Sequence, residues 1–174
     1  MINWQRLRQI DRDWTNRITI VDKRGKVRSL AALLARSGDS WVMMPVLGFI
    51  WWRGDNFWSH WGKIFFLSIL ITGAVVQIIK WSIRRERPVG SWGGLVRKTD
   101  PHSFPSGHAA KAGLLLGLGL YLGPDVFRYF ILIYSPLMAF ARTQMGIHYI
   151  SDVIAGFGLG VFMSIIMILR LVCF

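Results

Sequence analysis

Two long runs of uncharged, apolar residues constrain the fold of this chain more than any other feature. The run 64–79 lies between Lys63 and Lys80, and the run 153–169 holds no charged residue. A helix rises 1.5 Å per residue, so crossing a hydrocarbon core of about 30 Å takes about 20 mostly apolar residues. Both runs, extended by their flanks, approach that length. They predict helices that cross a membrane.

Three further apolar stretches predict helices that pack against these two. They are residues 41–52, 107–122 and 126–141. The first is short for a span, and we expect it to extend backward past Asp39 and forward to Arg53. We expect Asp39 to cap this helix rather than to pair with Arg36. The sequence therefore predicts an all-α fold, a polytopic membrane helical bundle of about five to six membrane helices within residues 39–174.

Apolar residues near the start of the chain recur three, four or seven positions apart, with basic residues mostly between them. The apolar positions are Trp4, Leu7, Trp14, Ile18 and Val21. This pattern over residues 3–22 predicts an amphipathic helix lying in the membrane interface. An ordinary helix packed on the core fits equally well. With a short helix near 29–35, it forms an amphipathic N-terminal segment, residues 1–38, of a single domain spanning 1–174.

The charge balance is strongly basic, with 21 Lys and Arg against 9 Asp and Glu among 174 residues. Because 53% of the residues are hydrophobic and the apolar runs are long, the sequence favours a membrane protein over a nucleic-acid-binding domain. We expect no nucleic-acid partner. The basic excess indicates contact with anionic membrane lipids or a phosphorylated substrate. We expect Arg84, Arg85, Arg97 and Lys98 to face anionic lipid or to help collect a phosphorylated headgroup. The lone Cys173 cannot form an internal disulfide, and no cluster of residues predicts a metal site.

Counting spans places the polar residues that flank the helices at one face of the membrane. After Lys80 comes a polar loop, residues 81–103, and the next two helices cross and return. The residues brought to one face are Lys80, Arg87, Ser106, His108, Arg142, His148 and Asp152. Such a set predicts a phosphate site, because phosphoryl transfer needs positive donors around the phosphate oxygens, a nucleophile and an acid.

Each predicted phosphate ligand can bind oxygen in a distinct way. Arg87 and Arg142 can each donate two parallel hydrogen bonds, and Lys80 adds a point charge. Ser106 and Gly107 begin a helix, where free N–H groups and the helix dipole favour an anion. Taken alone, Lys80 or Arg87 would indicate a membrane-interface anchor. The combination favours phosphate binding.

The remaining members of the set suit catalysis. His148 and Asp152 are four residues apart, so we expect them on one helix face, where the carboxylate holds one imidazole nitrogen while the other attacks. His108 can donate a proton to the departing alkoxide. Lys111, one turn after His108, either contacts substrate or lines a polar cleft, and His102 is a second possible substrate contact.

Three motifs carry a resemblance to a known family. They are Lys80-(six residues)-Arg87-Pro88, Pro105-Ser106-Gly107-His108, and Arg142-(five residues)-His148-(three residues)-Asp152. Their order and spacing resemble the signature of the type 2 phosphatidic acid phosphatase (PAP2) superfamily over roughly residues 40–172. One departure is Ala141, where the family often has Ser, which removes one hydroxyl but no charged group.

The resemblance implies a metal-independent, cofactor-free phosphatase that works through a phosphohistidine intermediate. It assigns His148 as nucleophile, Asp152 as its orienting partner and His108 as general acid. The phosphate ligands that it implies are Lys80, Arg87, Ser106, Gly107 and Arg142. It also implies a lipid phosphate as substrate, of the phosphatidylglycerol phosphate, polyprenyl diphosphate, phosphatidate or lipid A type.

Three alternatives use the same pocket. A vanadium haloperoxidase is disfavoured by the short chain and the membrane spans. A lipid phosphotransferase would need the same residues. A non-catalytic binding or transport protein for lipid phosphates is disfavoured because a binder needs no nucleophile such as His148.

Two indications disagree about which side of the membrane the site faces. Lys and Arg outside the motifs are more numerous at the site end of the chain, which by the positive-inside rule favours the cytoplasm. Many relatives of the family instead face the periplasm or the exterior. We expect a multi-pass protein of the cell (inner) membrane with its site on the extracytoplasmic face.

Overall fold

The computed structural model describes residues 4–89 and 94–172, and within them the fold is all-α, as predicted. The helices are α1 (Trp4–Ile18), α2 (Lys26–Ser37), α3 (Ser40–Arg53), α4 (Asn56–Ile83), α5 (Gly94–Thr99), α6 (Gly107–Leu122), α7 (Asp125–Gln144) and α8 (Ile150–Met167), which a π-helical turn (Ile168–Val172) continues. The short α5 lies inside the predicted loop 81–103. Among the described residues, β pairing is limited to one isolated bridge between Glu86 and His102.

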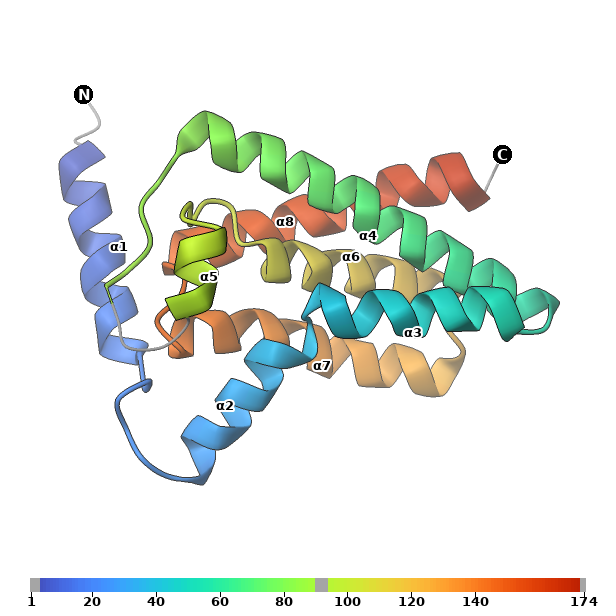
Figure 1. The fold of residues 1–174 in the computed structure, drawn as a ribbon, viewed down its shortest axis with the longest axis horizontal. Helices are drawn as coiled ribbons and strands as arrows, with labels where there is room; N and C mark the ends of the chain where they lie inside the picture. The colour runs from blue at the N-terminus through green and yellow to red at the C-terminus, as the bar shows by residue number, and fades with distance from the viewer. Residues whose placement is uncertain (1–3, 90–93, 173–174) are drawn as a thin grey trace.

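The helices α3, α4, α6, α7 and α8 lie side by side, while α1 crosses one end of the bundle (Figure 1). Their buried apolar side chains form one core, with Phe65 of α4, Leu114 of α6 and Met138 of α7 fully enclosed. A smaller apolar cluster joins α2 to the end of α7 and includes Ala35 and Met145. This second cluster supports the loop between α7 and α8.

Glycines bring α6 and α8 into backbone contact. A Cβ atom on Gly113 would lie 2.1 Å from the carbonyl oxygen of Phe157, and one on Gly160 would lie 1.9 Å from that of Ala110. Small residues allow such close approach between membrane helices. The two helices that begin in the predicted site are therefore held at short range.

Within the described ranges 4–89 and 94–172, two helices are long and apolar enough to cross a membrane, Asn56–Ile83 and the continuous stretch Ile150–Arg170. Large apolar side chains also point outward from the bundle, as on Trp52, Ile133 and Ile154, which are 76%, 66% and 67% exposed. Exposed apolar surface on this scale suits lipid rather than water. The chain is a membrane protein. The count of five to six membrane helices stays a prediction, since α3 has 14 residues and α6 has 16.

Helix α1 leaves most of its apolar side chains exposed. Trp4, Leu7 and Trp14 are 68%, 48% and 55% exposed, whereas Ile18 is half-buried and Val21, just beyond the helix, is buried in the smaller cluster. The exposed residues favour the interfacial alternative, which stays a prediction.

Polar side chains dock helix α1. Asp11 accepts a hydrogen bond from Ser151 N at 3.1 Å, and Thr15 Oγ1 accepts one from Ile150 N, also at 3.1 Å. Helix α1 thus caps the first turn of α8.

Candidate active site

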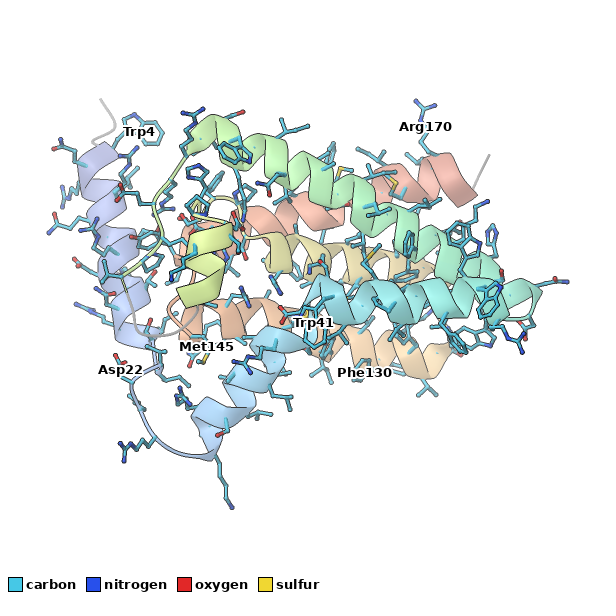
Figure 2. The ribbon with its side chains drawn as sticks, in the orientation of Figure 1. Trp4, Asp22, Trp41, Phe130, Met145 and Arg170 are labelled. Carbon is cyan, nitrogen blue, oxygen red and sulfur yellow. The ribbon has the colours of Figure 1, made fainter. Side chains whose placement is uncertain are left out.

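The predicted site residues lie at one end of the bundle, where α4 and α7 end and α6 and α8 begin (Figure 1). Met145 marks this end, and Arg170 lies far from it toward the opposite end (Figure 2). Most of the predicted residues are buried here: Lys80, Arg87, Ser106, Arg142, His148 and Asp152. The burial of so many charged groups indicates a built polar site, because unpaired charges are costly away from water.

His148 lies outside the helix that carries Asp152. Helix α8 begins at Ile150, and Tyr149 occupies its N-cap position. The prediction that His148 and Asp152 share a helix face is therefore wrong. The reason is local: Asp152 Oδ2 accepts a hydrogen bond from Tyr149 N at 2.9 Å and so caps the helix after His148. The histidine is held by the extended turn that enters α8.

The imidazole of His148 lies between a guanidinium and a carboxylate. Its Nε2 is 3.0 Å from Arg87 Nη1, and its Nδ1 is 3.6 Å from Asp152 Oδ2. A guanidinium can only donate, so Nε2 is the unprotonated nitrogen and Nδ1 carries the hydrogen that faces Asp152. Burial, followed by the charges of Arg87 and Arg142, lowers the pKa of His148 well below its usual range. The ring is neutral at neutral pH, with a lone pair on Nε2.

Asp152 is fixed by groups other than His148. Its Oδ1 accepts a hydrogen bond from Arg85 Nη1 at 2.7 Å, and its carbonyl oxygen accepts one from Ser106 N at 3.0 Å. The guanidinium of Arg85 also lies 4.1 Å from the centre of the Tyr149 ring and donates to Asp11. The prediction that Arg85 faces lipid is wrong, since its head group turns inward. Arg84 is exposed, and its contact with anionic lipid stays a prediction.

Two of the predicted phosphate ligands share an internal carboxylate. Asp100 Oδ2 accepts hydrogen bonds from Lys80 Nζ and, at 2.9 Å, from Arg87 Nη2. Lys80, Asp100 and Gly107 line a cavity of about 210 Å³ with His108 and Lys111. A carboxylate held between two cations next to a cavity marks where an anionic ligand can compete.

Arg142 is fully enclosed by the bundle. Its Nη1 donates to the carbonyl oxygen of Ala35 at 2.8 Å, and its Nε has no hydrogen-bond partner among the described residues. A buried donor without a partner is costly, which is a reason to expect a ligand oxygen here, and phosphate binding by Arg142 stays a prediction. Ser106 is the N-cap of α6 and accepts from Ala109 N at 3.4 Å, so the helix that begins at Gly107 has its N-terminus, where an anion is favoured, at this end of the bundle.

His108 and Lys111 both contact the junction between α2 and α3. His108 Nε2 is 2.7 Å from Asp39 Oδ1, and Lys111 Nζ donates to the carbonyl oxygen of Gly38. Asp39 is the N-cap residue of α3, but its side chain makes no capping hydrogen bond. The capping prediction is wrong because the carboxylate is turned toward His108 and also accepts from Trp41 Nε1 at 3.3 Å.

His102 lies at the edge of the site. Its ring meets Trp81 edge-on, with ring centres 5.4 Å apart, and its backbone pairs with Glu86. In the part of the chain that the structure describes, His102 makes no hydrogen bond to the predicted phosphate ligands. The same residues contain no group of three or more His, Cys, Asp or Glu side chains placed to hold a metal ion. Both substrate contact by His102 and metal independence stay predictions.

Sequence reasoning missed three charged partners of the site: Asp11, Arg85 and Asp100. Each lies far along the chain from the group it contacts, and Arg85 stands in a run of basic residues typical of a membrane interface. Asp100 offered one signal. It is one of two acidic residues, with Glu86, in a basic loop that ends next to the Ser106 motif.

Comparison with known proteins identifies relatives. A family model of the PAP2 superfamily matches residues 61–172. A lipid A 1-phosphatase of Rhizobium johnstonii is 28% identical over 112 residues, which cover 60% of this chain and 46% of that protein. This chain thus spans less than half the length of that relative. A decaprenylphosphoryl-5-phosphoribose phosphatase of Mycobacterium tuberculosis is 31% identical over 149 residues, covering 81% of this chain and 78% of that protein.

Two solved structures share the fold. The transmembrane PAP2 type phosphatidylglycerolphosphate phosphatase from Bacillus subtilis superposes with a TM-score of 0.72 at 20% identity, over 92% of this chain and 84% of that one. LpxE of Aquifex aeolicus gives a TM-score of 0.68 at 22% identity, over 87% and 91%. At these identities the likeness establishes the architecture.

Proposed function

Because this chain belongs to the PAP2 superfamily, we propose that it is a membrane phosphatase that removes phosphate from a lipid phosphate. Family membership confirms the resemblance drawn from the three motifs. The named relatives act on lipid A and on decaprenylphosphoryl-5-phosphoribose, and a structural neighbour acts on phosphatidylglycerolphosphate. These are the substrate classes to test first.

One observation carries the proposal: a buried, neutral imidazole presents its lone pair toward a cluster of cations. His148 Nε2 lies 3.0 Å from Arg87 Nη1, and Arg142 and Lys80 act on the same ring through their charges. Positive groups that bind phosphate oxygens also stabilise the charge of a phosphoryl transition state. A neutral nitrogen among them can attack phosphorus.

The proposed reaction has two steps. In the first, His148 Nε2 bonds to phosphorus while the bond to the leaving oxygen breaks, and His108 protonates that oxygen. In the second, the oxygen of a water molecule attacks the phosphorus of the phosphohistidine while His108 takes a proton from that water. The bond from phosphorus to His148 Nε2 then breaks and inorganic phosphate leaves. Asp152, whose Oδ2 lies 3.6 Å from Nδ1 of His148, stabilises the positive charge that the ring gains. Lys80, Arg87, Ser106, Gly107 and Arg142 hold the phosphate.

We propose that residues 1–38 and 39–174 act as a single domain, because Asp11 and Thr15 of α1 contact the start of α8. The exposed apolar residues of α1 suit the membrane interface. We also propose that the protein is multi-pass in the cell membrane with the site outside the cytoplasm. Phosphate release into the medium by intact cells, from a supplied short-chain lipid phosphate, is expected. Release only after lysis would contradict this orientation.

The purified protein is expected to release phosphate from at least one member of a lipid phosphate panel, and EDTA is expected to leave the rate unchanged. The panel contains phosphatidylglycerol phosphate, a polyprenyl diphosphate, phosphatidate, a lipid A 1-phosphate and decaprenylphosphoryl-5-phosphoribose. The physical reason is that Lys and Arg side chains supply the charge that a metal ion would otherwise supply. Turnover that depends on added divalent cations would contradict the mechanism.

Replacing the internal carboxylate, Asp100→Asn, is expected to tighten competitive inhibition by inorganic phosphate. The carboxylate occupies Lys80 and Arg87 and must give way to phosphate. A partly exposed ion pair is worth on the order of 1 kcal/mol, so the inhibition constant is expected to fall about fivefold. Asp125→Asn is the matched control, since Asp125 pairs with Arg128 at the start of α7, at the opposite end of that helix from Arg142. An unchanged or larger constant in Asp100→Asn would contradict competition at this position.

A further inference from the structure

The junction between α2 and α3 brings a second carboxylate to a second imidazole. Asp39 Oδ1 lies 2.7 Å from His108 Nε2, although the two residues are 69 positions apart in the sequence. Both side chains are partly buried, at 26% and 19% exposed. A hydrogen bond of this length between a carboxylate and an imidazole is a charge-assisted contact.

Helix α6 holds the junction in place. Lys111 Nζ donates to the carbonyl oxygen of Gly38 and, at 2.9 Å, to Ser40 Oγ, so it binds the residues on both sides of Asp39. Lys111 and His108 are three residues apart on α6 and therefore lie on one side of the helix. One helix thus positions the imidazole and the backbone of its carboxylate partner together.

Helix α7 holds the same junction from another side. Tyr134 donates its hydroxyl hydrogen to Ser37 Oγ at 2.6 Å, and Arg142 Nη1 donates to the carbonyl oxygen of Ala35 at 2.8 Å. A Cβ atom on Gly38 would lie 2.8 Å from Met138 Sδ and 3.2 Å from a ring carbon of His108. A glycine here lets the junction approach close enough for Asp39 to reach the ring.

The hydrogen positions of the pair follow from its geometry. The hydrogen bond with His108 lowers the pKa of Asp39, and burial opposes this effect. Burial and then the charge of Arg142 lower the pKa of His108 to about 3, while the bond to Asp39 opposes them, so the ring takes up its Nδ1 proton once a bound phosphate adds negative charge beside it. An ionised Asp39 can only accept, so His108 Nε2 carries a hydrogen. The other ring nitrogen, Nδ1, makes no hydrogen bond to any described residue, and the ring lines the cavity beside Lys80. Nδ1 is the nitrogen left to act on a ligand.

We propose that Asp39 is the positioning residue of His108, so that the site contains two carboxylate–imidazole pairs with opposite tasks. This inference rests on the proposed function. Asp152 and His148 form the nucleophilic pair. Asp39 and His108 form the acid pair, in which the carboxylate holds Nε2–H and stabilises the protonated ring.

The proton balance of the first step follows. As His148 Nε2 bonds to phosphorus and the bond from phosphorus to the leaving oxygen breaks, the Nδ1 proton of His108 passes to that oxygen and yields a neutral alcohol. His108 is left neutral, with Nε2–H still on Asp39. It then accepts a proton at Nδ1 from the attacking water, which restores the imidazolium as phosphate leaves.

Dependence on the leaving group separates this role from a structural one. Two esters with the same chain are needed: dodecyl phosphate, whose alkoxide must be protonated, and a nitrophenyl phosphate bearing a dodecyl chain, whose phenolate leaves unaided. General acid catalysis contributes about 100-fold or more where a proton is needed. For Asp39→Asn, kcat/KM is expected to fall about 100-fold on the alkyl ester and less than about threefold on the aryl ester. Asp39→Glu is expected to recover part of the loss.

A matched control and a double variant complete the experiment. Asp55 is also the N-cap residue of a helix, and it caps α4 through Trp58 N at 3.0 Å. Asp55→Asn is expected to change kcat/KM by the same factor on both esters. In a His108→Asn background, Asp39→Asn is expected to add no further loss on the alkyl ester, because the group it acts through is gone.

Each outcome decides between two claims. Equal losses on the two esters, or additive losses in the double variant, would overturn the role of Asp39 and leave the phosphatase proposal standing. A wild-type protein that cleaves neither ester, nor any lipid phosphate of the panel, would overturn the proposed function itself.

Discussion

His148→Ala is expected to lower kcat for lipid phosphate hydrolysis by on the order of 10⁴-fold or more, since removal of a covalent nucleophile ends the reaction path that it opens. The ring is 1% exposed and, among the described residues, makes one direct polar contact at hydrogen-bond length, to Arg87. Removing it leaves the cations of the site in place. The variant is therefore expected to bind the lipid phosphate while failing to turn it over.

The measurement that checks this is an alkaline quench that traps the covalent intermediate. Wild-type protein mixed with a phosphorus-labelled lipid phosphate and quenched in alkali is expected to carry label, because phosphohistidine survives alkali and is lost in acid. His148→Ala is expected to carry none. His60→Ala, an exposed histidine in the first turns of α4, serves as control and is expected to label normally. Full turnover by His148→Ala would instead favour a different nucleophile, and retained transport without any turnover would favour a carrier.

The gathering of the site residues was predictable because it depends on two local properties of the sequence. Apolar run length fixes where helices end, and the alternation of crossings fixes which ends share a face. Lys80, His108 and His148 stand at such ends, so their meeting followed from counting. The motif spacing then indicated the PAP2 superfamily, and the family match confirms that resemblance.

The partners of the site were not predictable in the same way. Asp39, Arg85 and Asp100 reach their partners through the relative placement of elements that only tertiary packing decides. The sequence pattern of Asp39 fits a helix cap, and the cap position is correct, yet the carboxylate binds His108. Local preference was overridden because a stronger charge-assisted contact is available across the bundle.

Glycines of α8 illustrate the same limit of sequence reasoning. Gly156, Gly158 and Gly160 follow one another at alternate positions and look equivalent in the sequence. In the structure, a Cβ atom on Gly156 would lie 2.4 Å from the carbonyl oxygen of Ser106, whereas one on Gly158 would meet nothing within 4 Å. Helical periodicity of 3.6 residues turns the middle glycine away from α6.

Gly156→Ala is therefore expected to impair catalysis and stability together, while Gly158→Ala does neither. The added methyl meets backbone atoms of Ser106, which cannot rotate away, so the start of α6 must shift from α8. That shift separates the phosphate-binding turn from His148 and Asp152. It also strains the 3.0 Å hydrogen bond from Ser106 N to the carbonyl oxygen of Asp152. Misplacement by about 1 Å can cost about 100-fold in rate, and overpacking costs about 1–3 kcal/mol.

The two variants form a matched pair on one helix, with the same chemical change and different surroundings. For Gly158→Ala, kcat/KM is expected to be unchanged and the free energy of unfolding to rise by about 0.5–1 kcal/mol, because alanine favours a helix over glycine. For Gly156→Ala, a loss of about 100-fold in kcat/KM and a lower Tm in detergent micelles are expected. Equal behaviour of the two variants would mean that the start of α6 does not rest on α8 as described. A contact other than that between α6 and α8 would then have to hold the phosphate-binding turn next to His148.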